Sequence, residues 1–257
     1  MYILENFLEY IVHLIFKFIP RSKNGSLSDV KIIAHRGWHN RQIKENTMKA
    51  FSVAVDKNLF GIEFDIRWTK DLIPIIHHDL SLKKSYGIDK EIGELSFEEL
   101  RELCPDIPKL SEVIDEFGKK ICFFIELKKE VWKDLKKQKD ILARELANLS
   151  PGVDFHFMVL HKSVLLDFNL FPNKEVAVLV SIFNPLEMLD IAIELNVKAL
   201  TGHFLLLNES IHRKCKANGI FLGTGYTRSQ NVMIREFNRG VKWQFTNHPE
   251  ILLNSMT

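Results

Sequence analysis

The sequence predicts an α/β protein that folds as a TIM barrel, in which eight parallel strands alternate with helices. Short apolar runs typical of buried strands alternate with helix-like stretches to the end of the chain, which favours repeated βα units. The apolar runs begin near Lys31, Gly61, Ile121, Phe155, Val176, Val197, Ile220 and Val241. These are about eight strands, the number that closes a (β/α)₈ barrel.

Helix starts are marked between these runs. Thr47 is a capping residue before an apolar pattern that begins at Met48, and Asn184-Pro185 places a proline near the first turn of another helix. The connection from Leu80 to Lys120 is the longest, with helical patterns over 96–103 and 109–117. We expect it to be a short insertion between the second and third strands that rises over the site.

The N-terminal segment is unusual because residues 2–19 are strongly apolar but carry a polar residue at every fourth position. Its early acids and lack of a cleavage signal argue against a signal peptide, and the same acids argue against a membrane span. We therefore expect residues 1–24 to form an amphipathic helix, followed by a barrel domain over 30–257. The helix either anchors the chain peripherally at a membrane through residues 2–19 or caps the bottom of the barrel.

Composition limits the partners and the compartment. The 257 residues are 46% hydrophobic and 26% charged, as in a globular protein with a full core. Lys and Arg total 35 against 33 Asp and Glu, so nothing favours a nucleic acid partner. The three cysteines have no metal-site or redox spacing, which predicts packing residues in a reducing compartment. We expect a cytoplasmic protein, with membrane association if the N-terminal segment is an anchor.

Polar residues end several of the predicted strands. His35-Arg36-Gly37 follows Ile32-Ile33-Ala34, and a third apolar run ends in His77-His78-Asp79. The alternation of a strand puts Glu63 and Asp65 on one face and Ile62, Phe64 and Ile66 on the other.

A further strand ends in Glu126 and Lys128. Glu63, Asp65 and Glu126 would then meet at one end of the sheet. Three carboxylates with open positions for water or phosphate oxygens suit a hard divalent cation, Mg²⁺ or Ca²⁺.

Together these segments resemble the glycerophosphodiester phosphodiesterases. The resemblance covers most of residues 31–128 and rests on His35-Arg36-Gly37, Glu45-Asn46-Thr47, Glu63-Phe64-Asp65, Thr69-Lys70-Asp71, His78-Asp79, Pro108 to Val113 and Ile125 to Lys128. It implies a TIM barrel that hydrolyses phosphodiesters, a metal held by Glu63, Asp65 and Glu126, and catalytic histidines at His35 and His78. Two imidazoles that titrate near neutral pH can serve as the base for the attacking oxygen and the acid for the leaving one.

Arg36 and Lys128 are candidate ligands of the substrate phosphate, the first as a bidentate fork and the second as a point charge. Each has a structural alternative: Arg36 could pair with one of the acids, and Lys128 could begin a solvated loop. Glu63 and Asp65 could instead pair with Arg67 or Lys70. His77 competes with His78, but strand alternation turns the two apart and only His78 precedes Asp79.

The C-terminal half departs from the family pattern. Many relatives carry a tryptophan on the seventh strand and an aspartate before the final proline segment, where this chain has Phe221 to Tyr226 and Asn247. The expected activity is metal-dependent hydrolysis of glycerophosphodiesters to an alcohol and glycerol 3-phosphate. A lysophospholipase D acting on membrane lysophospholipids is the alternative, and a noncatalytic phosphate-binding protein is a second one.

Overall fold

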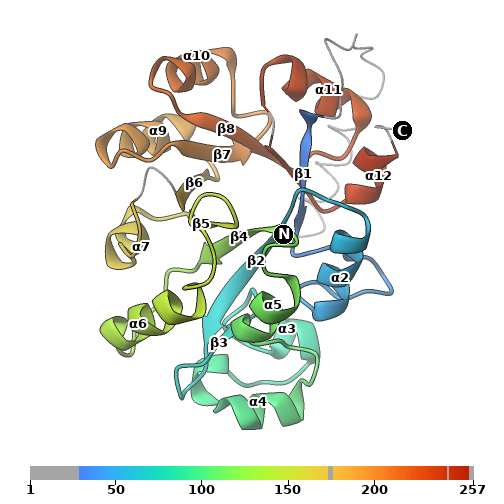
Figure 1. The fold of residues 1–257 in the computed structure, drawn as a ribbon, viewed down its shortest axis with the longest axis vertical. Coiled ribbons are helices and arrows are strands. Elements are labelled where there is room, and N and C mark those ends of the chain that lie inside the picture. Colours follow the sequence, from blue (N-terminus) through green and yellow to red (C-terminus); the bar gives the residue numbers. More distant parts are fainter. Residues whose placement is uncertain (1–28, 173–175, 242, 255–257) are drawn as a thin grey trace.

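A computed structural model of the chain describes residues 29–172, 176–241 and 243–254, and these form the predicted TIM barrel (Figure 1). Its eight parallel strands are β1 (Lys31–His35), β2 (Gly61–Trp68), β4 (Cys122–Leu127), β5 (Phe155–Val159), β6 (Ala177–Ser181), β7 (Ala199–His203), β8 (Phe221–Gly225) and β9 (Trp243–Thr246). Each strand pairs with its neighbours in chain order, and β1 closes the ring by pairing with both β2 and β9. All eight begin within two residues of the predicted starts.

A helix follows each strand of the ring. The helices are α2 (Met48–Asp56), α5 (Leu110–Phe117), α6 (Leu135–Glu145), α7 (Lys162–Asp167), α9 (Pro185–Glu194), α10 (Glu209–Ala217), α11 (Gln230–Asn238) and α12 (Pro249–Leu253). The predicted caps are present: the Thr47 hydroxyl accepts from the Ala50 amide, and Asn184 caps α9 with Pro185 in its first turn. Side chains that satisfy the first amides of a helix stabilise its start.

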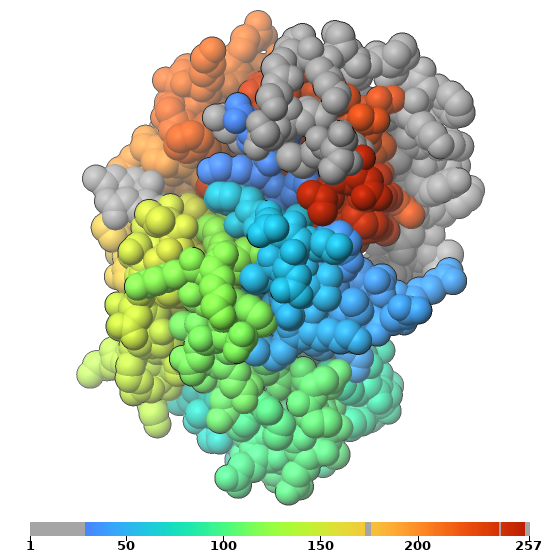
Figure 2. All heavy atoms as spheres, turned by 45° about the vertical axis from the view of Figure 1, so that its right-hand side comes forward, coloured from blue at the N-terminus to red at the C-terminus, as the bar shows by residue number. Residues whose placement is uncertain are grey.

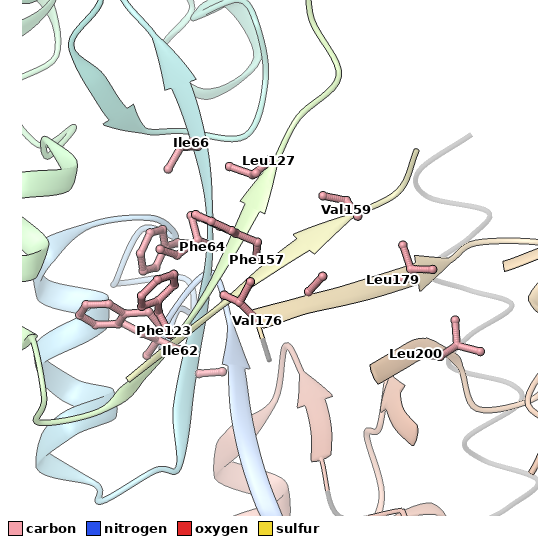
Figure 3. Close-up of a cluster of buried hydrophobic side chains, with 14 of the residues drawn as sticks. Ile62, Phe64, Ile66, Phe123, Leu127, Phe157, Val159, Val176, Leu179 and Leu200 are labelled. Atoms are coloured by element: carbon pink, nitrogen blue, oxygen red, sulfur yellow. The ribbon is translucent and has the colours of Figure 1, made fainter. Parts of the chain in front are cut away.

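Strand alternation separates two apolar layers. Ile62, Phe64 and Ile66 of β2 point outward and pack between the sheet and the helices, with Phe123 and Leu127 of β4 (Figure 3). The inward positions form a second cluster at the barrel centre: Ile33, Cys122, Phe124, Met158, Val178, Ala199 and Phe245. The carboxylates Glu63 and Asp65 occupy inward positions of β2, as the alternation predicted, and Glu63 lies opposite His35 at the end of β1.

The predicted insertion follows β2. The chain first forms β3 (Pro74–Ile76), which pairs antiparallel with β2 and precedes the predicted bounds of the insertion. The insertion then contains α3 (Lys83–Tyr86), a 3₁₀ turn η2 (Ile92–Glu94) and α4 (Phe97–Leu103). These elements have a core of their own, made of Ile75, Leu82, Ile92, Leu95, Leu100, Cys104 and Ile107. Figure 2 shows this part of the chain as a lobe at one end of the molecule.

The second predicted helix of the insertion, α5, belongs to the barrel. Its buried residues Leu110, Val113 and Phe117 are part of the main apolar core rather than of the insertion core. The insertion proper therefore ends before residue 110.

The predicted N-terminal helix over residues 1–24 lies outside the described residues. Within the described ranges, no helix combines the length and the apolar character needed to cross a membrane. Cys104, Cys122 and Cys215 are all buried and unbridged, in agreement with their predicted packing role.

Candidate active site

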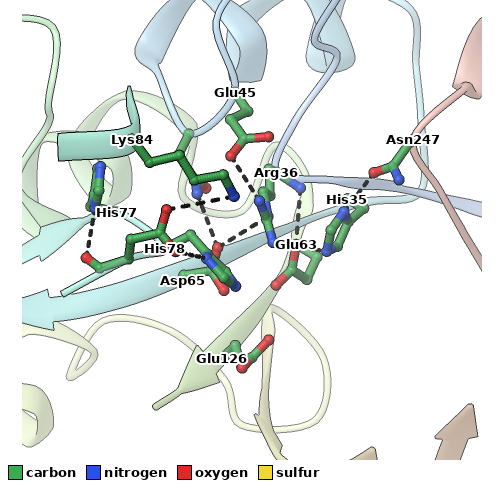
Figure 4. A network of polar contacts seen from close by, with 12 residues as sticks. His35, Arg36, Glu45, Glu63, Asp65, His77, His78, Lys84, Glu126 and Asn247 are labelled. Atoms are coloured by element: carbon green, nitrogen blue, oxygen red, sulfur yellow. Dashed lines mark hydrogen bonds and ion pairs between the residues drawn. The ribbon is translucent and has the colours of Figure 1, made fainter. Parts of the chain in front are cut away.

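Glu63, Asp65 and Glu126 form a cluster on the inward face of β2 and β4, where β1 and β4 end. Strand register brings them together, because Asp65 lies directly opposite Glu126 across the β2–β4 pair and Glu63 lies two residues earlier on the same face. One carboxylate oxygen from each lies within 4.8 Å of the others, and all three side chains are buried. The sequence prediction that these acids meet is confirmed as geometry (Figure 4).

The three carboxylates differ in electrostatic surroundings. Burial, together with Asp65 and Glu126, raises the pKa of Glu63 well above its usual value. Burial and the charge of Asp65 also raise the pKa of Glu126. Burial opposes ionisation of Asp65 too, but Lys128 and Arg36 outweigh it and hold the pKa of Asp65 well below its usual range. The cluster thus contains one firmly ionised acid and two whose ionisation is disfavoured by burial and by the neighbouring negative charge.

A divalent cation would supply positive charge to the cluster. The buried Oε1 atom of Glu63 has no hydrogen-bond partner among the described residues, although a buried oxygen normally has one. Three carboxylates without a sulfur or nitrogen donor between them make a ligand set suited to Mg²⁺ or Ca²⁺. The residues present therefore fit a hard cation.

Arg36 lies beside the cluster in the turn that follows β1. Its Nη1 donates to Glu45 Oε1 at 2.7 Å, its Nε lies 3.4 Å from Asp65 Oδ2, and its backbone amide donates to Glu63 Oε2. The turn requires the left-handed conformation at Arg36 and at Gly37 (φ 57° and 78°). A Cβ on Gly37 would lie 2.8 Å from the Phe51 ring, so only glycine fits there.

Lys128 lies between two of the acids. Its Nζ is 2.7 Å from Asp65 Oδ1 and 2.5 Å from Glu126 Oε1. Burial disfavours its charge, but the two carboxylates outweigh burial and raise the pKa of Lys128. Both Arg36 and Lys128 thus point toward the acids and contribute positive charge to the cluster.

His35 is the last residue of β1 and contacts Asn247, the residue that follows β9. Its Nδ1 is 2.6 Å from Asn247 Oδ1, and its Nε2 is 3.7 Å from Glu63 Oε2. Because an amide oxygen can only accept, we assign the proton to Nδ1, which leaves Nε2 as an acceptor on the side of the acids. Burial and the nearby Arg36 lower the pKa of His35 to about 4, so the ring is neutral at physiological pH.

His78 lies two residues beyond β3, on the other side of the Glu63 and Asp65 pair from His35 (Figure 4). Its Nδ1 lies 2.8 Å from Asp79 Oδ1. Burial lowers the pKa of His78, with a further contribution from Arg36 and Lys128. The neighbouring His77 turns away from the acids and bonds the Asp79 carbonyl, so the expected divergence of the two rings is present.

Three further polar residues contact the predicted ones. Glu45 binds Arg36, the Asn46 side-chain amide donates to Asp65 Oδ2 at 3.0 Å, and Asn247 binds His35. Glu45 and Asn46 precede the Thr47 cap at the start of a helix. The sequence could have indicated them as site residues, because this helix start follows the end of a strand and belongs to the Glu45-Asn46-Thr47 segment of the family resemblance. Asn247 follows the last strand, but only closure of the barrel brings it to His35.

Arg67 does not pair with the acids, in contrast to the alternative interpretation of the sequence. Its guanidinium donates instead to the backbone carbonyl of His78.

The sequence profile described as "Glycerophosphoryl diester phosphodiesterase family" matches residues 35–251, which is most of the chain and includes every candidate site residue. The chain belongs to the glycerophosphoryl diester phosphodiesterase family. This confirms the resemblance seen in the sequence, and it extends the resemblance beyond residue 128.

Relatives within the family cover the chain to different extents. The chain is 25% identical over 258 residues to a glycerophosphodiester phosphodiesterase of Caldanaerobacter subterraneus, with 87% of this chain and 96% of that protein aligned. It is 34% identical over 71 residues to a lysophospholipase D of Mus musculus, which is 28% of this chain and 21% of that protein. It spans less than a third of the length of several other curated relatives.

Solved structures share the fold. An Oleispira antarctica phosphodiesterase in complex with the product sn-glycerol-3-phosphate superposes with a TM-score of 0.76 at 20% identity, covering 90% of this chain and 99% of that one. At this level of identity the similarity establishes the barrel architecture.

Proposed function

We propose that this protein is a metal-dependent glycerophosphodiester phosphodiesterase that releases an alcohol and glycerol 3-phosphate. One observation carries the proposal: one carboxylate oxygen from each of Glu63, Asp65 and Glu126 lies within 4.8 Å of the others, and His35 and His78 lie on either side of the Glu63 and Asp65 pair. Membership of the family and alignment over most of the Caldanaerobacter enzyme support the substrate class.

The two histidines are proposed to move protons. His35 presents an unprotonated Nε2 on the side of the acids and serves as the base for the attacking oxygen. His78 is the proposed acid for the leaving alcohol oxygen in its protonated form, in which Nδ1 donates to the Asp79 carboxylate and Nε2 carries the proton that is transferred. Arg36 and Lys128 would neutralise charge on the phosphate oxygens, although both contact the acids in this structure.

Glu63, Asp65 and Glu126 would hold the divalent cation. When bound, it supplies Lewis acid activation of the phosphate. Burial and the charges of the neighbouring acids raise the pKa of Glu63 and Glu126, and positive charge held between these residues would favour their ionised forms.

The test is hydrolysis of glycerophosphocholine by the full chain, followed as release of choline and glycerol 3-phosphate after chelation and re-addition of Mg²⁺, Ca²⁺, Mn²⁺ or Zn²⁺. We expect activity to disappear with chelator and to return with a hard cation. Glu63→Gln should lower kcat/KM by on the order of 100-fold or more. Glu194→Gln is the matched control, because Glu194 is an exposed partner of Lys162. Binding of glycerol phosphate without turnover would identify a noncatalytic phosphate-binding protein instead.

A lysophospholipase D activity is the second candidate, because apolar side chains are exposed beyond the strand ends on the side of the site. Ile182 and Phe183 follow β6, Leu205 follows β7 and Tyr226 follows β8, with 86% of Phe183 and 50% of Tyr226 exposed. Tyr226 stacks on His203 with ring centroids 5.2 Å apart. We call these four residues the apolar rim. Such a surface suits the acyl chain of a lysophospholipid.

Comparison of two substrates separates the candidates. If the lipid is a substrate, Phe183→Ser should raise KM for a lysophosphatidylcholine and leave kcat/KM for glycerophosphocholine unchanged. Val153→Ser is the control, since Val153 is also largely exposed, at 71%, but precedes β5 at the opposite end of the strands. No hydrolysis of the lipid by the unaltered chain would eliminate this candidate.

A further inference from the structure

Arg67 has an unusual position for a buried cation. It lies on β2 two residues beyond Asp65, on the inward face, and is 8% exposed. Its side chain nevertheless turns away from the acid cluster. A buried guanidinium requires both hydrogen-bond acceptors and a counter-charge, so its partners indicate its role.

The guanidinium binds the backbone of the segment that carries His78. Nε and Nη2 both donate to the His78 carbonyl oxygen, at 2.9 and 2.8 Å. Nη1 lies 3.6 Å from Glu130 Oε2, and both side chains of this ion pair are largely buried. Arg67 therefore links three parts of the site: β2, the His78 segment and the loop after β4.

His78 needs such a support because the sheet does not extend to it. β3 ends at Ile76, and the next backbone bond to β2 runs from the His77 amide to the Asp65 carbonyl. Beyond that point the hydrogen bonds described for His78 are the one between its ring and the Asp79 carboxylate and the two that its carbonyl oxygen accepts from Arg67. The first sets the ring tautomer, and the second fixes the peptide from which the ring projects.

We propose that Arg67 is a positioning residue that holds His78 in its catalytic orientation by forking onto its backbone carbonyl, with the Glu130 carboxyl group as the second partner of the guanidinium. The proposal rests on the role assigned to His78 under the proposed function. Two donors on one oxygen define the direction of the peptide, whereas a lysine ammonium would provide a single contact. Arg67 acts through His78 and does not touch the substrate.

A double-mutant cycle tests this with the full chain, the activating cation and glycerophosphocholine. Arg67→Met should lower kcat on the order of 10- to 100-fold with little change in KM, because a small misplacement of a reacting group is costly. In a His78→Ala background the same change should have almost no further effect on kcat, since the group that Arg67 positions is gone. Arg67→Lys, which keeps a single cationic donor group, should give a kcat between those of the wild type and Arg67→Met. It also allows the test to proceed if Arg67→Met does not fold.

Arg101→Met is the matched control. Arg101 forms an ion pair with Glu112 at the edge of the insertion and should alter kcat in neither background. Equal losses from Arg67→Met with and without His78 would overturn the positioning role while leaving the proposed function intact. Wild-type turnover by His78→Ala would instead refute the catalytic role of His78, and the role of Arg67 with it.

Discussion

At the scale of single residues, the contact between His35 and Asn247 has the clearest chemical consequence. The amide oxygen fixes the proton of His35 on Nδ1 but carries no charge, so it does not stabilise an imidazolium as a carboxylate would. In this chain burial therefore dominates and keeps His35 neutral, with a pKa of about 4.

Removal of this acceptor should impair turnover. We expect Asn247→Ala to lower kcat for glycerophosphocholine about tenfold or more, because the His35 ring loses its orientation. Asn247→Asp retains an oxygen in the same place and should keep kcat near the wild-type value at alkaline pH, where His35 is neutral in either case. Steady-state kinetics of the two variants provides the measurement, and an equal loss in both would contradict the orienting role.

At the scale of elements, the main core between sheet and helices meets the insertion core at β3, where Ile76 belongs to the first and Ile75 to the second. In the insertion core Leu100 of α4 is fully buried, whereas Leu103 on the same helix is 38% exposed. The insertion also lies against the His77 and His78 segment, since Tyr86 of α3 is near the His77 ring. Its stability therefore bears on the site as well as on the lobe.

The two leucines allow a matched comparison. Leu100→Ala should lower the free energy of unfolding by about 2–5 kcal/mol, since it leaves a cavity in a closed core. Leu103→Ala should change it by less than about 1 kcal/mol. Urea unfolding followed by tryptophan fluorescence distinguishes them, and similar losses would show that the insertion core is not a packed unit.

The elements also show what the sequence could and could not predict. Apolar runs located all eight barrel strands, and alternation placed Glu63 and Asp65 correctly, because burial leaves a local pattern. The assignment of α5 to the insertion was wrong, since an amphipathic pattern does not say which core the helix covers. The direction of Arg67 was not predictable either: its partners His78 and Glu130 lie 11 and 63 positions away, and only tertiary structure brings them together.

At the scale of the whole molecule, a histidine inside the barrel couples stability to pH. His156 stacks on Phe124 at 5.0 Å and lies edge-on to Trp243, in the apolar centre of the ring. Burial lowers its pKa from 6.5 to about 4. The native state therefore binds this proton less readily than the unfolded chain, so the contribution to stability is complete above pH 6.5 and is lost as pH falls toward 4.

The expected size of this effect is about 3 kcal/mol at pH 4, from roughly 1.4 kcal/mol per pKa unit. His156→Gln, which does not titrate, should show a correspondingly shallower loss of stability between about pH 6.5 and pH 4. Chemical denaturation at a series of pH values measures both slopes. Parallel curves for the two proteins would show that His156 is protonated as easily in the barrel as in the unfolded chain.

The closure of the ring between β1 and β9 has a consequence for how the protein becomes active. Lys31 pairs with Trp243, so the first and last strands of the barrel join only after almost the whole chain has emerged from the ribosome. The same step brings Asn247 to His35. Strand pairing over such a sequence separation is slow, and a nascent chain must keep its unpaired β1 edge from other partners until then. Onset of the proposed activity would thus report the closure of the ring.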